Sequence, residues 1–467
     1  MKKKLEIFGT FFIILFCVLM NLIFEKKEPI IIIILNINIF YLAYKLREEK
    51  KNIMIFYFVA CNFIFNTSIA LTNYLDNKYL LNSMFFTNNV PFNLEISKFI
   101  YDILIINCIG ILLGEVIIKF LKGKDNKVLI KNENILLKIL FFFFCISFGV
   151  ILILNILEVK DRISIGYAIS YTKEISKNIS YYLLTLFNFL IIIYLALKPN
   201  ISIKTKIIVI LNIFLLFISS FGGSRGIFLI GFVFFIWYLE VSEIFKLKKR
   251  HMFILIFLVA VYSSYISDMR EDYGKKSFQY EKINFKIIEI PKNFLKSQNG
   301  TSGMIGYIKI FPEIFINENN GKMMFYSFHS FYDSIFDKKK LLSNIFNEKL
   351  GKRVASVTRV SYIVNPELVK KGYGLGGNYI LEMYEIGKEA GVLIFSILFV
   401  LLIYFLENIF KNNNSVYKNI FVLLVFQKIF YAPRSLYFDF NIRKYIYLCL
   451  IYFIMSKLFT ISKLKKR

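Results

Sequence analysis

Two arginines lie in short connections between long apolar segments, where an unpaired charge is costly. Arg225 belongs to the run Phe-Gly-Gly-Ser-Arg-Gly at 221–226, and Arg434 follows Pro433 in a second connection. The fork of a guanidinium group matches the oxygens of a phosphate, so two arginines that face one aqueous pocket would suit a phosphate-containing ligand. Arg270, just after another apolar segment, is a third candidate for the same ligand.

Both arginines also have a purely structural interpretation. Gly222 and Gly226 are spaced as a GxxxG packing pair, so the first run can be a tight helical hairpin from which Arg225 reaches toward water. Arg434 can equally be an interfacial anchor, because Pro433 ends the apolar segment before it. The residues leave both interpretations open beside the phosphate hypothesis.

A glycine-rich run leads into a further apolar segment and carries the strongest acidic candidates. Glu382 and Glu385 are three positions apart, so they share one face of the short helix that we expect there. One of them could act as a general base beside a bound substrate, although acidic groups near a helix start are also favoured electrostatically. The candidate substrate-binding residues of this run are Gly374, Gly376, Gly377, Tyr384 and Glu385.

The glycine spacing and the histidines give weaker signals. The glycines formally match GxGxxG, but no strand–helix–strand context supports a dinucleotide site. His329, in an aromatic run at 326–332, is a further candidate base, although aromatic neighbours at helical spacing favour amphipathic packing. With no cluster of Cys and His and no Walker A motif, we predict no metal site and no nucleotide cofactor.

Membrane helices must position these candidates. The 467 residues are 57% apolar and only 19% charged, whereas soluble domains are about 45–50% apolar and about 25% charged. Apolar blocks of roughly 20 residues predict an all-α, polytopic integral membrane protein. About 12 transmembrane helices are predicted, at residues 6–24, 30–46, 53–72, 98–119, 136–157, 181–197, 206–221, 227–242, 252–267, 388–410, 418–432 and 445–460.

The net charge of +27 does not indicate a nucleic-acid-binding protein, because the lysines occupy short loops rather than one soluble face. Most loop Lys and Arg fall inside if the N-terminus is cytoplasmic, so both termini are predicted to be cytoplasmic. One long connection falls outside, and loops of this length are usually functional. The predicted parts are a membrane domain at 1–266, a large extracytoplasmic loop at 267–377 and a membrane domain at 378–467.

Three motifs, in this order, resemble those of the Wzy-type oligosaccharide repeat-unit polymerases, which make O-antigen and capsular polysaccharide at bacterial inner membranes. The arrangement of many spans with one large late periplasmic loop is similar to that of the family over most of the chain. The sequence of the loop itself departs most from the family pattern. The motifs are Gly-Ser-Arg-Gly at 223–226, Gly-Leu-Gly-Gly-Asn-Tyr-Ile-Leu-Glu-Met-Tyr at 374–384 with Gly387 and Gly391 after it, and Pro-Arg-Ser at 433–435.

The resemblance implies a membrane-embedded glycosyltransferase fold that needs no metal or nucleotide. It implies transfer of a growing glycan from undecaprenyl pyrophosphate to the sugar hydroxyl of a new lipid-linked unit, on the periplasmic side. The matching motifs give Arg225 and Arg434 a role at the pyrophosphate and place Glu382 at an acidic family position. A flippase and a chain-length regulator are the protein partners that it implies, with no nucleic acid.

Two other functions remain open at this point. An O-antigen ligase would move finished polymer to another acceptor, and the motif set favours the polymerase over it. A polysaccharide flippase or other transporter usually has two related halves and charged groups near the middle of its spans. The sequence has neither feature, so it favours an enzyme over a transporter.

Overall fold

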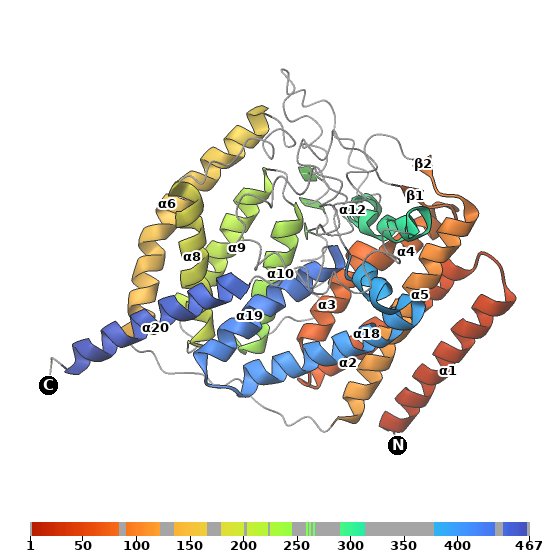
Figure 1. Ribbon diagram of the computed structural model, residues 1–467, viewed down its shortest axis with the longest axis horizontal. Helices are drawn as coiled ribbons and strands as arrows, with labels where there is room; N and C mark the ends of the chain where they lie inside the picture. The colour runs from red at the N-terminus through yellow and green to blue at the C-terminus, as the bar shows by residue number, and fades with distance from the viewer. Residues whose placement is uncertain are drawn as a thin grey trace. The chain divides into compact units, whose positions relative to one another are not determined.

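The part of the chain that the computed structural model describes is almost entirely helical (Figure 1). Seven helices among the described residues are long and apolar enough to cross a membrane, which confirms the prediction of an all-α, polytopic membrane protein. Described helices lie at every predicted span except 252–267, which falls mostly outside the described residues. The described residues are 2–83, 90–121, 135–165, 179–199, 203–222, 225–244, 258–259, 261–262, 265–266, 290–312, 378–434 and 442–464.

The chain forms two compact units. Unit 1 contains Met1–Asp125, Pro291–Phe405 and Lys428–Phe440. Two short antiparallel strands, β1 (Asn82–Ser83) and β2 (Val90–Pro91), precede the helix that begins at Leu94. The helices that lie wholly or largely in this unit are α1 (Lys2–Ile23), α2 (Glu28–Glu48), α3 (Met54–Asn62), the π-helix η1 (Phe63–Thr67), α4 (Ser68–Leu75), α5 (Leu94–Phe120), α12 (Ile290–Gln298), the 3₁₀-helix η2 (Asn299–Gly306), α13 (Tyr307–Ile310), α18 (Tyr379–Asn412) and the 3₁₀-helix η6 (Ala432–Arg434).

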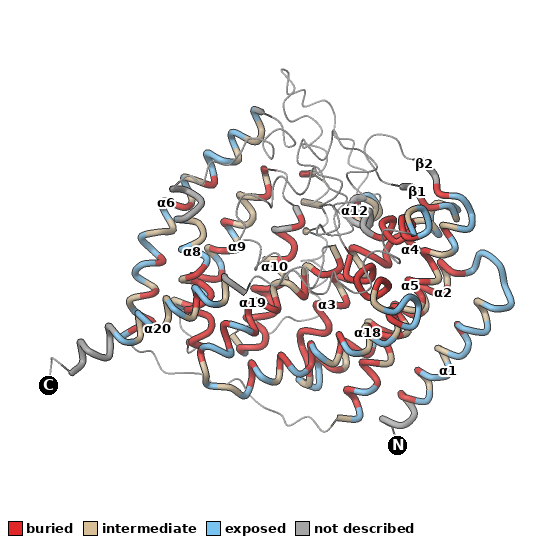
Figure 2. The backbone as a smooth tube through the Cα atoms, in the orientation of Figure 1, coloured by how far each residue is buried: buried red, intermediate tan, exposed pale blue. Residues whose placement is uncertain are grey.

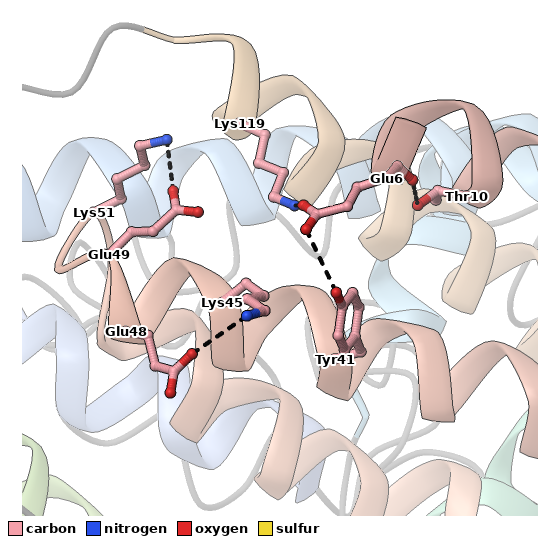
Figure 3. A network of polar contacts seen from close by, with 8 residues as sticks. All are labelled: Glu6, Thr10, Tyr41, Lys45, Glu48, Glu49, Lys51 and Lys119. Carbon is pink, nitrogen blue, oxygen red and sulfur yellow. Dashed lines mark hydrogen bonds and ion pairs between the residues drawn. The ribbon is translucent and has the colours of Figure 1, made fainter. Parts of the chain in front are cut away.

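α1 packs at the edge of unit 1 and exposes most of its apolar surface, as Figure 2 shows. An ion pair fixes one end of α1, because Glu6 accepts from the buried ammonium group of Lys119 on α5. The Tyr41 hydroxyl lies 3.5 Å from the same carboxylate (Figure 3). Near the other end, Asn21 donates to Asp102 at 3.3 Å. These polar contacts therefore hold α1 against the rest of unit 1, while its exposed apolar residues are suited to contact with lipid.

α5 and α18 approach each other closely through two glycines of α5. A Cβ atom added at Gly110 would lie 2.6 Å from Cβ of Ser396 and 2.9 Å from the carbonyl oxygen of Leu393. One added at Gly114 would lie 2.8 Å from Cβ of Val400. The pair forms a GxxxG motif, which lets helix backbones meet in membranes.

Gly110→Ala is therefore expected to destabilise the protein by about 1–3 kcal/mol, because the new methyl group must displace a backbone atom of α18. Thermal unfolding of the purified protein in detergent measures the effect as a lower melting temperature. The matched control is Gly149→Ala, since nothing lies within 4 Å of a Cβ added there. The control should be neutral or stabilising, because alanine favours helix over glycine.

A described piece of the predicted large loop belongs to unit 1. α12 places Lys292 and Lys296 on Asp76, directly after α4, and both ammonium groups pair with its carboxylate. Hydrogen bonds from the two lysines lower the pKa of Asp76 to about 2. η2 then packs against η1 and against the start of α5. This piece consists of short helices.

Asp76→Asn is expected to speed amide hydrogen exchange in α12 several-fold at neutral pH, with little change in the melting temperature, because exposed ion pairs contribute only about 0–1 kcal/mol. The folded pKa of Asp76 is depressed, so this contact stabilises above about pH 4 and is lost as the pH falls toward about 2. Glu49→Gln removes the exposed pair with Lys51 and should leave α12 unchanged. Equal exchange in both variants would contradict the assignment.

Unit 2 contains Asn126–Ile290, Leu406–Gln427 and Asn441–Arg467. Its single Trp, Trp237, packs against Phe426 with ring centroids 4.5 Å apart and against Phe410 at 5.5 Å. Lys198 donates to the carbonyl oxygen of Asn413 at 2.7 Å, which satisfies a carbonyl group after α18. Its helices are α6 (Ile135–Ile165), α8 (Ile179–Ala196), α9 (Ile203–Ser220), α10 (Arg225–Val241), most of α19 (Val416–Tyr431) and α20 (Ile442–Leu464).

Candidate functional site

The glycine-rich run leads into a helix that is broken near its start. α18 has non-helical backbone at Gly387 and Lys388. Lys388 has a φ of 51°, a conformation that favours glycine. We call residues 379–386 the short arm of α18 and residues 389–405 the long arm.

The two arms run antiparallel and in contact. Tyr379, at the start of the short arm, stacks on Phe399 with ring centroids 5.4 Å apart. Ser396 donates to the sulfur of Met383 at 3.6 Å. Next to the break, a Cβ added at Gly391 would lie only 2.4 Å from the carbonyl oxygen of Met383. The short arm therefore folds back along the long arm, and the fold depends on a glycine at 391.

Buried asparagines hold the start of the short arm. Asn378 donates to Oδ1 of Asn66 at 2.6 Å, and Asn66 donates to Oδ1 of Asn62 at 2.9 Å. The Tyr379 hydroxyl donates to Oδ1 of Asn62 at 2.9 Å and lies 3.1 Å from Oδ1 of Asn107. All five residues are buried. A buried and satisfied polar network specifies one arrangement, so it fixes where the short arm begins.

The π-helix η1 joins this network to a second predicted motif. π-Helical turns are rare and are frequent at functional sites. Asn66 of η1 holds Asn378, while the ring of Phe65 in η1 lies 5.6 Å from Cζ of Arg434. η6, which carries Arg434, also packs against η1. The Pro-Arg-Ser motif and the glycine-rich motif thus contact the same five-residue helix.

Both acidic candidates lie in the short arm and are buried. Glu382 is 2% exposed and Glu385 is 8% exposed. The Tyr384 hydroxyl donates to Glu389 across the break at 3.3 Å, and its ring packs edge-on against Phe99. The structure confirms a short helix that carries Glu382 and Glu385, while their chemical roles stay predictions.

Comparison with known proteins decides the family. Residues 6–466 match the family model of O-antigen polysaccharide polymerase Wzy. The chain belongs to this family. No curated protein and no solved structure matches it. Membership supports an enzyme that polymerises oligosaccharide repeat units and that acts on lipid-linked units in a membrane.

The other predicted site residues of this Wzy polymerase are placed less fully. Arg225 is the first residue of α10 in unit 2, and its side chain lies outside the described part of the chain. A pocket shared by Arg225 and Arg434 therefore stays a prediction. The remaining candidates, Arg270, His329, Gly374, Gly376 and Gly377, lie outside the described residues. Within the described ranges, no three His, Cys, Asp or Glu residues are grouped to hold a metal ion.

The asparagine network is the part of the candidate site that sequence reasoning missed. Asn62 and Asn66 are four residues apart in an apolar stretch, and Asn107 lies in the middle of the apolar helix α5. Polar residues inside membrane helices usually face a partner or a functional site. That signal was available in the sequence, but the sequence did not tell which segment would supply the partner.

Proposed function

We propose that this Wzy polymerase transfers the growing glycan from undecaprenyl pyrophosphate to a sugar hydroxyl of a new lipid-linked unit, on the outer side of the bacterial cytoplasmic membrane. The anomeric C–O bond to the pyrophosphate breaks, and a C–O bond to the acceptor hydroxyl forms. Undecaprenyl pyrophosphate leaves with the bonding electron pair. The energy of the reaction is stored in the bond that breaks, so no nucleotide is required.

The observation that carries this proposal is the shared contact at η1. Arg434 and the segment that leads to Glu382 both rest on this one helix. Such a reaction needs a cation for the departing phosphate and a base for the acceptor proton. A rigid, buried helix that contacts both segments can hold the cation and the base in a fixed geometry, which catalysis requires.

In this proposal Arg434 binds the pyrophosphate and stabilises the charge that develops on it. Its guanidinium group can bind two phosphate oxygens at once, and the ring of Phe65 stabilises the cation beside it. Arg225 keeps its predicted phosphate-binding role as a separate hypothesis. A flippase that delivers the lipid-linked unit and a chain-length regulator are the proposed protein partners.

Glu382 is the proposed general base. It takes the proton from the acceptor hydroxyl as that oxygen attacks the anomeric carbon. Its burial removes competing water from the carboxylate. Glu385, one helical turn away, is the second candidate for the same role.

Arg434→Lys tests the phosphate role, because lysine keeps the charge but loses the planar fork. We expect polymerisation of purified lipid-linked repeat units to fall by about 10- to 100-fold. The matched control is Arg47→Lys on α2, where the buried arginine lies 5.3 Å from the ring of Phe56. Full activity in Arg434→Lys would mean that Arg434 is only an anchor.

A further inference from the structure

Unit 2 contains a cavity that has several polar side chains in its lining and that none of the predicted site residues lines. It has a volume of about 320 Å³ and lies between α6, α8 and α9, with Phe228 of α10 beside it. This volume falls in the range of about 300–1,000 Å³ that is usual for small-molecule sites. Its polar lining residues are Asn155, Glu158, Arg162, Asn188, Asn212 and Ser219.

The polar lining is unusual for such an apolar helix as α6. Asn155, Glu158 and Arg162 follow one another at spacings of three and four, so they share one face. That face lines the cavity, at the end of a helix whose most apolar 18-residue stretch has a mean hydropathy of 2.8. Asn155 lies near the end of the predicted span 136–157, and Glu158 and Arg162 follow just after it. Polar residues at this depth usually face a partner or an aqueous site.

The cavity lies at the end of α9 that carries the Gly-Ser-Arg-Gly motif. Ser219 lines it, and the buried Gly222 follows three residues later. A Cβ added at Gly222 would lie 2.9 Å from Cδ of Arg162. In the predicted topology, this end of α9 is the extracytoplasmic end, where the glycan is handled.

The charge of the cavity argues against a phosphate. Arg162 is held by Glu158, with Nη2 and Oε1 2.5 Å apart. The pair is neutral overall, and its carboxylate would repel an anion. Amide groups both donate and accept hydrogen bonds, as sugar hydroxyls do. The buried amides of Asn155 and Asn212, with apolar rings such as Phe228 beside them, therefore fit an uncharged sugar.

We propose that this cavity is a glycan subsite that binds a neutral sugar of the lipid-linked oligosaccharide through Asn155, Asn188, Asn212 and the Glu158–Arg162 pair. The inference rests on the proposed function, because a lipid-linked oligosaccharide is the substrate there. It adds a recognition site for the sugar, separate in role from the groups that act on the pyrophosphate.

The test uses the full-length protein in nanodiscs and the free repeat-unit oligosaccharide, without lipid or phosphate, as the probe. Saturation-transfer NMR measures its binding. Asn212→Leu and Asn188→Leu are each expected to weaken binding by about tenfold, the effect of one lost hydrogen-bonding partner. The second variant keeps the test decisive if the first fails to fold, because Asn188 is exposed and tolerates leucine beside lipid.

The matched control is Asn38→Leu on α2. Asn38 donates to the carbonyl oxygen of Ile34, four residues before it, as Asn212 donates to that of Ile208. Equal binding by the control and the cavity variants would overturn the proposal. So would a wild-type protein that binds no free oligosaccharide at millimolar concentration, or that binds inorganic pyrophosphate in the cavity instead.

Glu382→Gln separates the two proposals, because it should still bind the free oligosaccharide. If that variant also polymerises normally while Asn212→Leu loses binding, the proposed base fails and the glycan subsite stands. If Glu382→Gln loses activity while both cavity variants bind as the wild type does, the subsite alone fails.

Discussion

Glu382→Gln is expected to abolish long glycan chains and to leave single lipid-linked repeat units. Glutamine keeps the size of the buried side chain but cannot accept the proton of the acceptor hydroxyl. Removal of a general base typically slows a reaction by about 10²- to 10⁴-fold, which would erase the ladder of polymer lengths on a gel. A strain that lacks the polymerase and carries the variant, with its lipid-linked glycans extracted, gives the measurement.

Variants of two neighbouring carboxylates test whether the loss of long chains is specific to Glu382. Glu389→Gln changes an exposed residue just after the break in α18 and should leave the ladder normal. Glu385→Gln tests the second candidate base, three residues from Glu382. A normal ladder with Glu382→Gln and none with Glu385→Gln would move the role of base to Glu385. Normal ladders with both would remove the short arm from the chemistry.

Gly391→Ala is expected to reduce polymerisation by about 100-fold without preventing insertion of the protein. The added methyl group would lie 2.4 Å from the carbonyl oxygen of Met383, which is backbone and cannot rotate away. The short arm must therefore move, and Glu382 is the residue next to Met383. A displacement of about 1 Å at a catalytic group can cost about 10²-fold in rate.

The control for this prediction is Gly387→Ala, in the same motif. Nothing lies within 4 Å of a Cβ added at Gly387, and its φ is not positive. Gly387→Ala should therefore keep near-normal activity. If both variants lose activity alike, the motif needs flexibility at the break and not close packing at Gly391. Polymerisation rates and melting temperatures of both purified variants decide between these explanations.

The sequence predicted the helices well because lipid imposes a single rule on them. Every backbone group in the hydrocarbon must be paired internally, so an apolar block of sufficient length becomes a helix. The start of the tenth predicted span at residue 388 coincides with the break in α18. Pro433 likewise ends α19, as its missing N–H predicts, with only the short η6 following.

The arrangement of the site could not be predicted from the same sequence. A π-helical turn leaves no recognisable pattern of residue types, so η1 was read as part of one continuous span. The partners of Asn62 and Asn66 come from a distant segment, and amide side chains pair with many groups. The close pair Gly110 and Gly114 was also overlooked, because glycine in an apolar helix does not reveal which helix it meets.

Unit 1 is formed by segments that are far apart in the sequence, so its parts are synthesised at different times. Asn378 is added to the chain 312 residues after its partner Asn66. Because chains are synthesised at about 5–20 residues per second, about 15–60 s pass between the two additions. All the described helices of unit 2 up to α10 are translated in that interval. The nascent chain therefore carries Asn66 without this partner until Asn378 has been synthesised.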